Sequence, residues 1–177
     1  SGVQGFLTGQ TIGTGWVVQS TTTSATVLSD AYSGGGADWP IGSDGNQYLY
    51  VGDSLGTSVV SQDVVLAGGV LHTLTFDFAT FRSPGIPGRL TLDVIQGGSS
   101  VLVGGPFVLN VPFTGASGVF APHSLSFTTT VSGTYTVQFA STSGLVANVD
   151  NFDLVPAPGA AGLWLLAAGV GARRRRR

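Results

Sequence analysis

The sequence predicts an all-β protein, an antiparallel β-sandwich followed by a short C-terminal hydrophobic helix. Thr, Val, Phe and Gly are abundant, with 28 glycines in 177 residues, and these residue types favour strands and turns. Short apolar runs alternate with polar residues along residues 14–154 and are separated by Gly, Ser, Asp and Pro. No segment before Pro156 carries a helical repeat of apolar residues over three turns.

Eleven segments are predicted as strands because each is short and bounded by turn residues. In chain order they are Gly15–Ser20, Ala25–Ser29, Gln47–Gly52, Ser58–Leu66, Val70–Ala79, Arg89–Gln96, Ser100–Val103, Phe107–Phe113, Ser124–Thr130, Thr134–Ser141 and Ala147–Val155. Alternation is clearest in Val70–Ala79, where His72, Leu74, Phe76 and Phe78 share one face. Such one-sided strands are typical of antiparallel sheets packed as a sandwich.

The chain divides into residues 1–154, the predicted sandwich, and residues 155–177. Residues 159–172 contain no charge and would span about 21 Å as a helix. Adding the four preceding residues lengthens this to about 27 Å, close to the roughly 30 Å hydrocarbon core of a bilayer. A core helix is the alternative, but it would show a polar stripe, and this run shows none.

Five arginines close the chain: Arg173, Arg174, Arg175, Arg176 and Arg177. Such a cluster is retained on the cytoplasmic side of a membrane, which would leave residues 1–155 outside. The alternative is a solvated or nucleic-acid-binding tail. However, the body carries only two arginines against nine aspartates, a net charge of −7, and this argues against nucleic-acid binding.

The end of the chain resembles a known sorting signal. Val155, Pro156, Ala157 and Pro158, then the apolar run, then the arginines resemble the PEP-CTERM signal of exopolysaccharide-producing Gram-negative bacteria. The resemblance implies export to the cell envelope or extracellular space and transient anchorage in the inner membrane. It also implies recognition by an exosortase near Val155–Pro158 and removal of the tail. Ala157 replaces the glutamate of the usual Pro-Glu-Pro.

The body is predicted to be non-catalytic. It has no cysteine and no Gly-x-Ser-x-Gly elbow, and its only histidines are His72 and His123. Each histidine has the strand parity of apolar neighbours, which indicates a rim or core position rather than a ligand or base. A hydrolase with paired aspartates is the less favoured alternative.

Calcium is the one cofactor that the residues suggest. Asp38, Asp44 and Asn46 lie in a Gly-rich loop and offer the oxygen ligands that calcium prefers, although Asp and Asn also shape turns. Asp150 shares parity with Phe152 and Leu154 and is therefore predicted to point inward. A buried carboxylate needs a partner, and structural pairing and a calcium site remain open alternatives.

Glycan binding would use exposed aromatic rings flanked by polar groups. Trp39, Tyr48 and Tyr50 are the candidates, with Tyr32 beside them. Trp39 precedes Pro40 within a loop and is predicted to be the most exposed. Trp16 begins a strand as Gly-Trp-Val-Val and is predicted to belong to the core.

The body also resembles a family. Its motifs occur in order as Gly15–Val18, Trp39 ahead of Asp44–Leu49, Val60–Val64, Leu74–Ala79 and Val149–Leu154. This order resembles the choice-of-anchor, galactose-binding-like domains, which are similar to carbohydrate-binding modules. The resemblance implies a jelly-roll-like β-sandwich that binds or organises extracellular polysaccharide in a biofilm matrix. A structural surface glycoprotein without a sugar site is the alternative. His72 stands where the family usually has Tyr, and the family's opening Asn-Gly-x-Phe-Glu strand is not recognisable in Ser1–Thr14.

Overall fold

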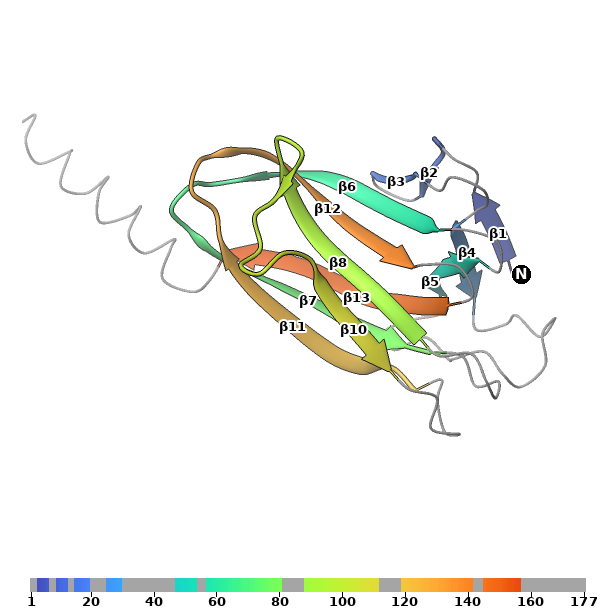
Figure 1. Cartoon of the computed structure of the whole chain (residues 1–177). Helices are drawn as coiled ribbons and strands as arrows, with labels where there is room; N and C mark the ends of the chain where they lie inside the picture. The colour runs from blue at the N-terminus through green and yellow to red at the C-terminus, as the bar shows by residue number, and fades with distance from the viewer. Residues whose placement is uncertain are drawn as a thin grey trace, which may run out of the picture.

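The computed structural model describes residues 3–6, 9–12, 15–19, 25–29, 47–53, 57–80, 88–111, 119–141 and 145–156 (Figure 1). These residues form thirteen strands: β1 (Val3–Phe6), β2 (Thr11–Ile12), β3 (Trp16–Val18), β4 (Ala25–Ser29), β5 (Gln47–Asp53), β6 (Ser58–Leu66), β7 (Leu71–Ala79), β8 (Gly88–Gln96), β9 (Ser99–Ser100), β10 (Phe107–Val111), β11 (Ala121–Thr128), β12 (Gly133–Ser141) and β13 (Leu145–Pro156). The predicted all-β fold is therefore confirmed for this part of the chain. No helix within these ranges is long and apolar enough to cross a bilayer.

The predicted C-terminal helix lies outside the described residues. So do Ala157, Pro158 and the arginines Arg173–Arg177. Val155 and Pro156, the first two residues of the predicted sorting motif, are the last two residues of β13 and pair with Thr73 and His72, so they do not lengthen the predicted helix as the sequence suggested.

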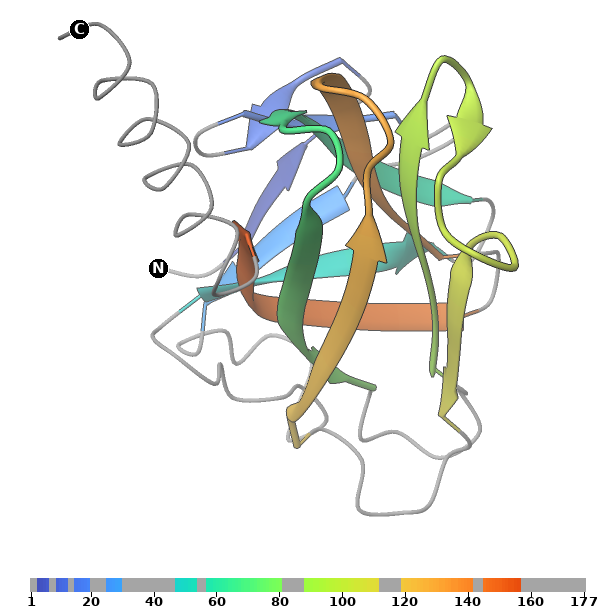
Figure 2. The ribbon, with the colours of Figure 1, turned by 90° about the vertical axis from the view of Figure 1, so that its left-hand side faces the viewer.

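The strands pack as two antiparallel layers (Figures 1 and 2). One layer has the order β1–β4–β5–β13–β7–β11. The other has the order β2–β3–β6–β12–β8–β10, with β9 paired to the end of β8. Among the described residues, one parallel pairing, between Val146 of β13 and Gly88 of β8, joins the layers.

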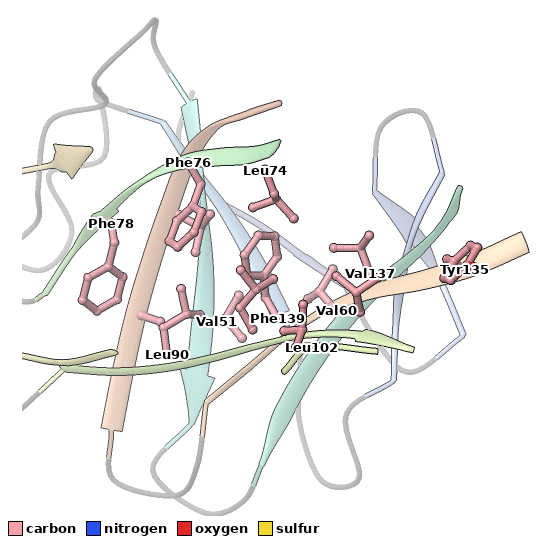
Figure 3. Packing of buried hydrophobic residues seen from close by; sticks show 14 of the residues in the cluster. Val51, Val60, Leu74, Phe76, Phe78, Leu90, Leu102, Tyr135, Val137 and Phe139 are labelled. Carbon is pink, nitrogen blue, oxygen red and sulfur yellow. The ribbon is translucent and has the colours of Figure 1, made fainter. Parts of the chain in front are cut away.

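The core fills the space between the layers, and Figure 3 shows its side chains interdigitating. Alternate residues of each strand enter it, as the period of two requires. The first layer contributes Leu74, Phe76 and Phe78 of β7, and the second contributes Leu90, Leu92 and Val94 of β8 with Val137 and Phe139 of β12. All eight are at most 2% exposed. Burying each such side chain contributes about 1.5–3 kcal/mol to the stability of the fold. Burial of the alternating apolar residues is therefore the main stabilising contribution.

Two parts of the strand prediction were wrong. The sequence predicts a first strand at Gly15, but β1 and β2 precede it and pair with β4 and β3. β1 is only four residues long and has a glycine inside it, which weakens its pattern. The predicted strand Ser100–Val103 is reduced to Ser100, because the chain turns at Gly104 and Gly105, whose φ angles are +87° and +88°.

Candidate binding site

An aromatic hollow of about 210 Å³ opens where β5 and β13 part. Its lining comes from both layers of the sandwich. Four rings, three aliphatic side chains and two polar residues form it: Trp16, Tyr48, Phe139, Phe152, Ile12, Leu49, Val149, Asp150 and Asn151. The volume is below the roughly 300–1,000 Å³ of pockets for drug-sized molecules, so the hollow fits one small ring or side chain.

A β-bulge in β13 opens this hollow. β5 pairs with β13 only as far as Leu49 opposite Val149. β13 continues along β7, and its register shifts between Asp150 and Asp153, so that one extra residue enters. Asn151, at this point, has a left-handed φ of +49°. Asn tolerates this conformation better than most residues, and the chain can therefore turn away from β5 here.

Three aromatic rings pack together inside the hollow. The Trp16 ring lies 5.4 Å from that of Phe139, and it meets Phe152 edge to face at 5.1 Å and 85°. Phe139 and Phe152 meet edge to face at 5.5 Å and 88°. Edge-to-face pairs at these distances add about 0.5–1.5 kcal/mol beyond their buried area. Phe139 is fully buried and Trp16 half-buried, so the cluster forms a rigid apolar wall.

The polar rim consists of Asp150 and Asn151. The Asn151 N–H donates to Asp150 Oδ1 at 2.8 Å, which orients the half-exposed carboxylate. Asp150 lies directly opposite Asp77 of β7. Like charges in directly opposed strand positions repel. The rim is therefore an anionic, hydrogen-bonding edge beside an apolar wall.

The inward prediction for Asp150 was wrong. Its cross-strand partner Asp77 alternates with the buried residues Phe76 and Phe78, and directly opposed residues share a face. Asp150 therefore lies on the outer face of its layer. The bulge reverses the parity of β13, so that Phe152 packs inward while Asp150 does not. Counting alternate residues back from Leu154 therefore assigns Asp150 to the wrong face of the strand.

The aromatic residues predicted to bind a sugar occupy different positions in the structure. Tyr48, a candidate for an exposed sugar-binding ring, is 3% exposed and packs against Phe120 at 5.5 Å. Tyr48 nevertheless lines the hollow, together with Asp150. Tyr50 is half-buried, lies opposite Asn148 and does not line the hollow. Trp39 lies outside the described residues.

Of the calcium candidates, only Asp150 lies within the described residues. Asp38, Asp44 and Asn46 lie outside them. Within the part of the chain that the structure describes, no group of three or more His, Cys, Asp or Glu could hold a metal ion. The carboxylate directly opposite Asp150 is that of Asp77.

Both histidines occupy the core and rim positions that the sequence predicts. His72 is 3% exposed, and its Nε2 lies 3.2 Å from the Ala67 carbonyl oxygen and 3.3 Å from Thr129 Oγ1. His123 is half-buried and stacks on Phe76 at 5.6 Å. Burial lowers the pKa of His123 below its ordinary value, and Asp77 partly opposes this shift.

Sequence reasoning missed Trp16 and Phe152 as site residues. Both were assigned to the apolar face of a strand, and both do pack on the core. The sequence pattern could not show that the pairing between β13 and β5 ends next to these two residues. The Asp-Asn pair at residues 150–151 is the only local signal, because Asn tolerates the left-handed backbone of a bulge.

Comparison of the sequence with protein-family models and with curated proteins finds no match. Solved structures do share the fold. The CBM22-1 xylan-binding domain of Xyn10C from Paenibacillus barcinonensis has a TM-score of 0.54 and 11% identity, over 86% of this chain and 92% of that chain. The CBM22-1–GH10 modules of Clostridium thermocellum xylanase 10B have a TM-score of 0.52 and 11% identity, over 82% of this chain and 26% of that chain.

The enzymatically active domain of bacteriophage CBA120 tailspike protein 4 gives a TM-score of 0.52 and 14% identity, over 81% of this chain and 19% of that chain. The chain thus spans about a fifth of the tailspike chain and a quarter of the xylanase chain. At these identities the likeness shows the fold: a β-sandwich like that of carbohydrate-binding modules.

Proposed function

We propose that this protein is a non-catalytic polysaccharide-binding sandwich that is exported to the cell envelope by its C-terminal sorting tail. The observation that carries the binding proposal is the aromatic hollow, set in a sandwich like that of carbohydrate-binding modules. One similar domain is described as xylan-binding, which motivates xylan as one ligand to test.

The chemistry of the hollow suits one sugar ring. A sugar presents apolar C–H faces to aromatic rings and hydroxyl groups to carboxylates and amides. Trp16 and Phe152 supply the apolar wall, and Asp150 and Asn151 supply acceptors and donors at the rim. The small volume favours recognition of a single residue of a polysaccharide, with the rest of the ligand outside the hollow.

The same chemistry argues for binding without catalysis. Glycoside hydrolysis normally uses two carboxyl groups on either side of the scissile bond. Asp150 is the one carboxylate among the described residues that line the hollow. His72 and His123 are held against Thr129 and Phe76 and are not among its lining residues. A hydrolase therefore stays the weaker alternative, and turnover that is abolished by replacing one aspartate would revive it.

The sorting proposal follows from the end of the chain. Val155 and Pro156 are exposed at the end of β13, so an exosortase that acts near Val155–Pro158 would meet the motif at the edge of the folded body. Residues 159–172 would hold the chain in the inner membrane, and Arg173–Arg177 would keep the tail cytoplasmic. Replacing these arginines with neutral residues should impair retention or processing, seen as altered localisation and mass.

A matched pair of variants tests sugar binding. Asp150 and Asp153 lie on the same strand, and each accepts a hydrogen bond from the next backbone N–H at 2.8 Å, but only Asp150 lines the hollow. We expect Asp150→Asn to weaken binding of the best polysaccharide in a panel by about tenfold or more, since a hydrogen bond to a charged group contributes about 1.5–3 kcal/mol. Asp153→Asn should bind like the wild type. Equal effects of the two variants, or no binding across the panel, would contradict the proposal.

A structural surface glycoprotein is the second candidate. The outer face of β7 and β11 is hydroxyl-rich: Thr73 Oγ1 and Ser126 Oγ lie 3.1 Å apart, and Thr75 lies opposite Ser124. Ser124 and Ser126 are exposed and could carry sugars. Sugar-sized mass increments on the native protein, together with no binding to the panel, would favour this candidate.

A further inference from the structure

The end of the sandwich from which the chain leaves β13 has a distinct surface. Pro156 lies opposite His72, at the start of β7. β6 and β11 end here and β7 and β12 begin here, so the β6–β7 and β11–β12 turns lie together. Figure 1 shows both turns at its left-hand side, beside the end of β13.

Exposed apolar side chains gather at this end. Of the seven large hydrophobic residues that are exposed among the described residues, five lie here: Val65, Leu71, Val103, Val131 and Val155. We call this surface the apolar end. Leu71 and Val103 also line a hollow of about 430 Å³, which continues the surface between β11 and the start of β10. Exposed apolar side chains that gather at one end of a domain indicate a partner.

The two turns of the apolar end carry no formal charge, and the nearest carboxylates on its strands are those of Asp63 and Asp153, two residues from Val65 and Val155. Residues 64–76, 94–111 and 121–141 contain neither Asp nor Arg, although the body as a whole is acidic. The histidine at the turns, His72, is buried. Uncharged turns reduce the repulsion that an acidic surface would feel near anionic lipid headgroups.

Hydrogen bonds hold the two turns rigid. Gly69 N donates to the Thr129 carbonyl at 2.7 Å, and Gly68 N donates to Ser132 Oγ at 2.8 Å. The Tyr135 hydroxyl donates to the Val131 carbonyl at 2.6 Å. Val131 is 54% exposed on this scaffold, so its exposure is a fixed property of the turn.

The position of the apolar tail identifies the partner. Only two residues, Ala157 and Pro158, separate β13 from the uncharged run 159–172. Two residues reach at most about 7 Å. The headgroup layer on each side of a bilayer is about 5–8 Å thick, the difference between a roughly 30 Å core and a total of 40–45 Å. If the run inserts in the membrane, the end of β13 must lie at the lipid surface.

We propose that the apolar end rests on the outer surface of the membrane that holds the tail, with Leu71, Val103 and Val131 in the headgroup layer. This inference rests on the proposed membrane insertion of residues 159–172. It adds that the sandwich stands in one orientation on the bilayer. Because the apolar end lacks basic residues, the contact is hydrophobic and should depend little on salt or on anionic lipid.

The absence of native cysteine allows a direct test. Val131→Cys and Val119→Cys are each labelled with an environment-sensitive fluorophore in the full chain and reconstituted in phosphatidylcholine vesicles. Val119 is the matched control, because it is a valine at 73% exposure just before β11 and so lies at the opposite end of that strand. We expect a blue shift and severalfold protection from an aqueous quencher at residue 131 and none at residue 119, unchanged by phosphatidylglycerol or by salt.

Three results would overturn the inference, each distinguishably. Failure of the chain to stay with the vesicles would overturn membrane anchorage and this contact with it. Retention with full quenching at residue 131 would overturn only the contact, leaving anchorage and sugar binding standing. Protection that rises with protein concentration, together with disulfide-linked dimers of unlabelled Val131→Cys, would show that a second copy covers the apolar end.

Discussion

Gly68 and Val131 lie so close that a β carbon on residue 68 would be 2.5 Å from the Val131 carbonyl carbon. This contact joins the β6–β7 turn to the β11–β12 turn through backbone atoms, which cannot move aside as a flexible side chain can. Only glycine fits at position 68.

Gly68→Ala should therefore lower the free energy of unfolding by about 1–3 kcal/mol, the usual effect of overpacking. Gly133→Ala is the matched control, because its β carbon would meet only Gln96 Nε2, at 3.2 Å and at the end of a flexible side chain. Urea unfolding of both variants measures the difference. Similar destabilisation by the two would show that the turns adjust more freely than the contact implies.

Stability should fall in mild acid because of His123. Burial beside Phe76 lowers the pKa of His123 below 6.5, so the unfolded chain binds a proton more readily than the folded chain. The contribution is complete above pH 6.5 and is lost as the pH falls through the lower folded pKa. His123→Gln should flatten this part of the profile, measured as unfolding free energy between pH 7.5 and 5. An unchanged slope would assign the acid sensitivity to other groups.

The buried carboxylate of Asp93 is stabilised by a hydrogen bond from Ser100. The Asp93 carboxylate is 6% exposed, and its Oδ1 accepts hydrogen bonds from the Ser100 hydroxyl and from Val94 N. Ser100→Ala removes one donor from a buried charge and should cost about 1–3 kcal/mol of stability. Ser99→Ala, one residue away and exposed, should change stability by less than about 0.5 kcal/mol. Thermal unfolding of both variants checks this, and a neutral Ser100→Ala would contradict it.

The bulge at Asn151 requires a left-handed backbone. Asn151→Val should destabilise the fold by about 1–2 kcal/mol, because a β-branched residue tolerates that conformation poorly. Asn151→Gly should be nearly neutral, since glycine adopts it without steric penalty. Chemical unfolding of the pair provides the measurement. If both variants were equally destabilised, the lost Asn side chain rather than the backbone would be responsible.

Much of the fold follows from local pattern. The alternation in Val70–Ala79 and in the segments around Leu90–Val94 and Tyr135–Phe139 predicted strands whose apolar faces are the observed core. These strands are long and one-sided, so the period of two is unambiguous. β1 and β2 were not predicted because strands of four and two residues are too short to show a clear alternation. They are held in place by pairing with β4 and β3.

The site could be predicted only in part. Tyr48 and Asp150 were selected on chemical grounds and do line the same hollow, but Tyr48 is more buried than a sugar-binding ring would need, and the predicted inward direction of Asp150 was wrong. Both differences have one source, which is that exposure depends on neighbours distant in sequence. Phe120 covers Tyr48, and the bulge that redirects Asp150 is a property of the pairing between β13 and β7.

The most direct test of sugar binding is a chemical-shift titration of the isotope-labelled protein with an oligosaccharide from the polysaccharide that binds best. The Trp16 indole N–H and the Asn151 amide should show the largest shifts and saturate together, and Asp150→Asn should diminish both. Shifts confined to residues away from the hollow, with Trp16 and Asn151 unmoved at saturation, would contradict the assignment of the sugar site.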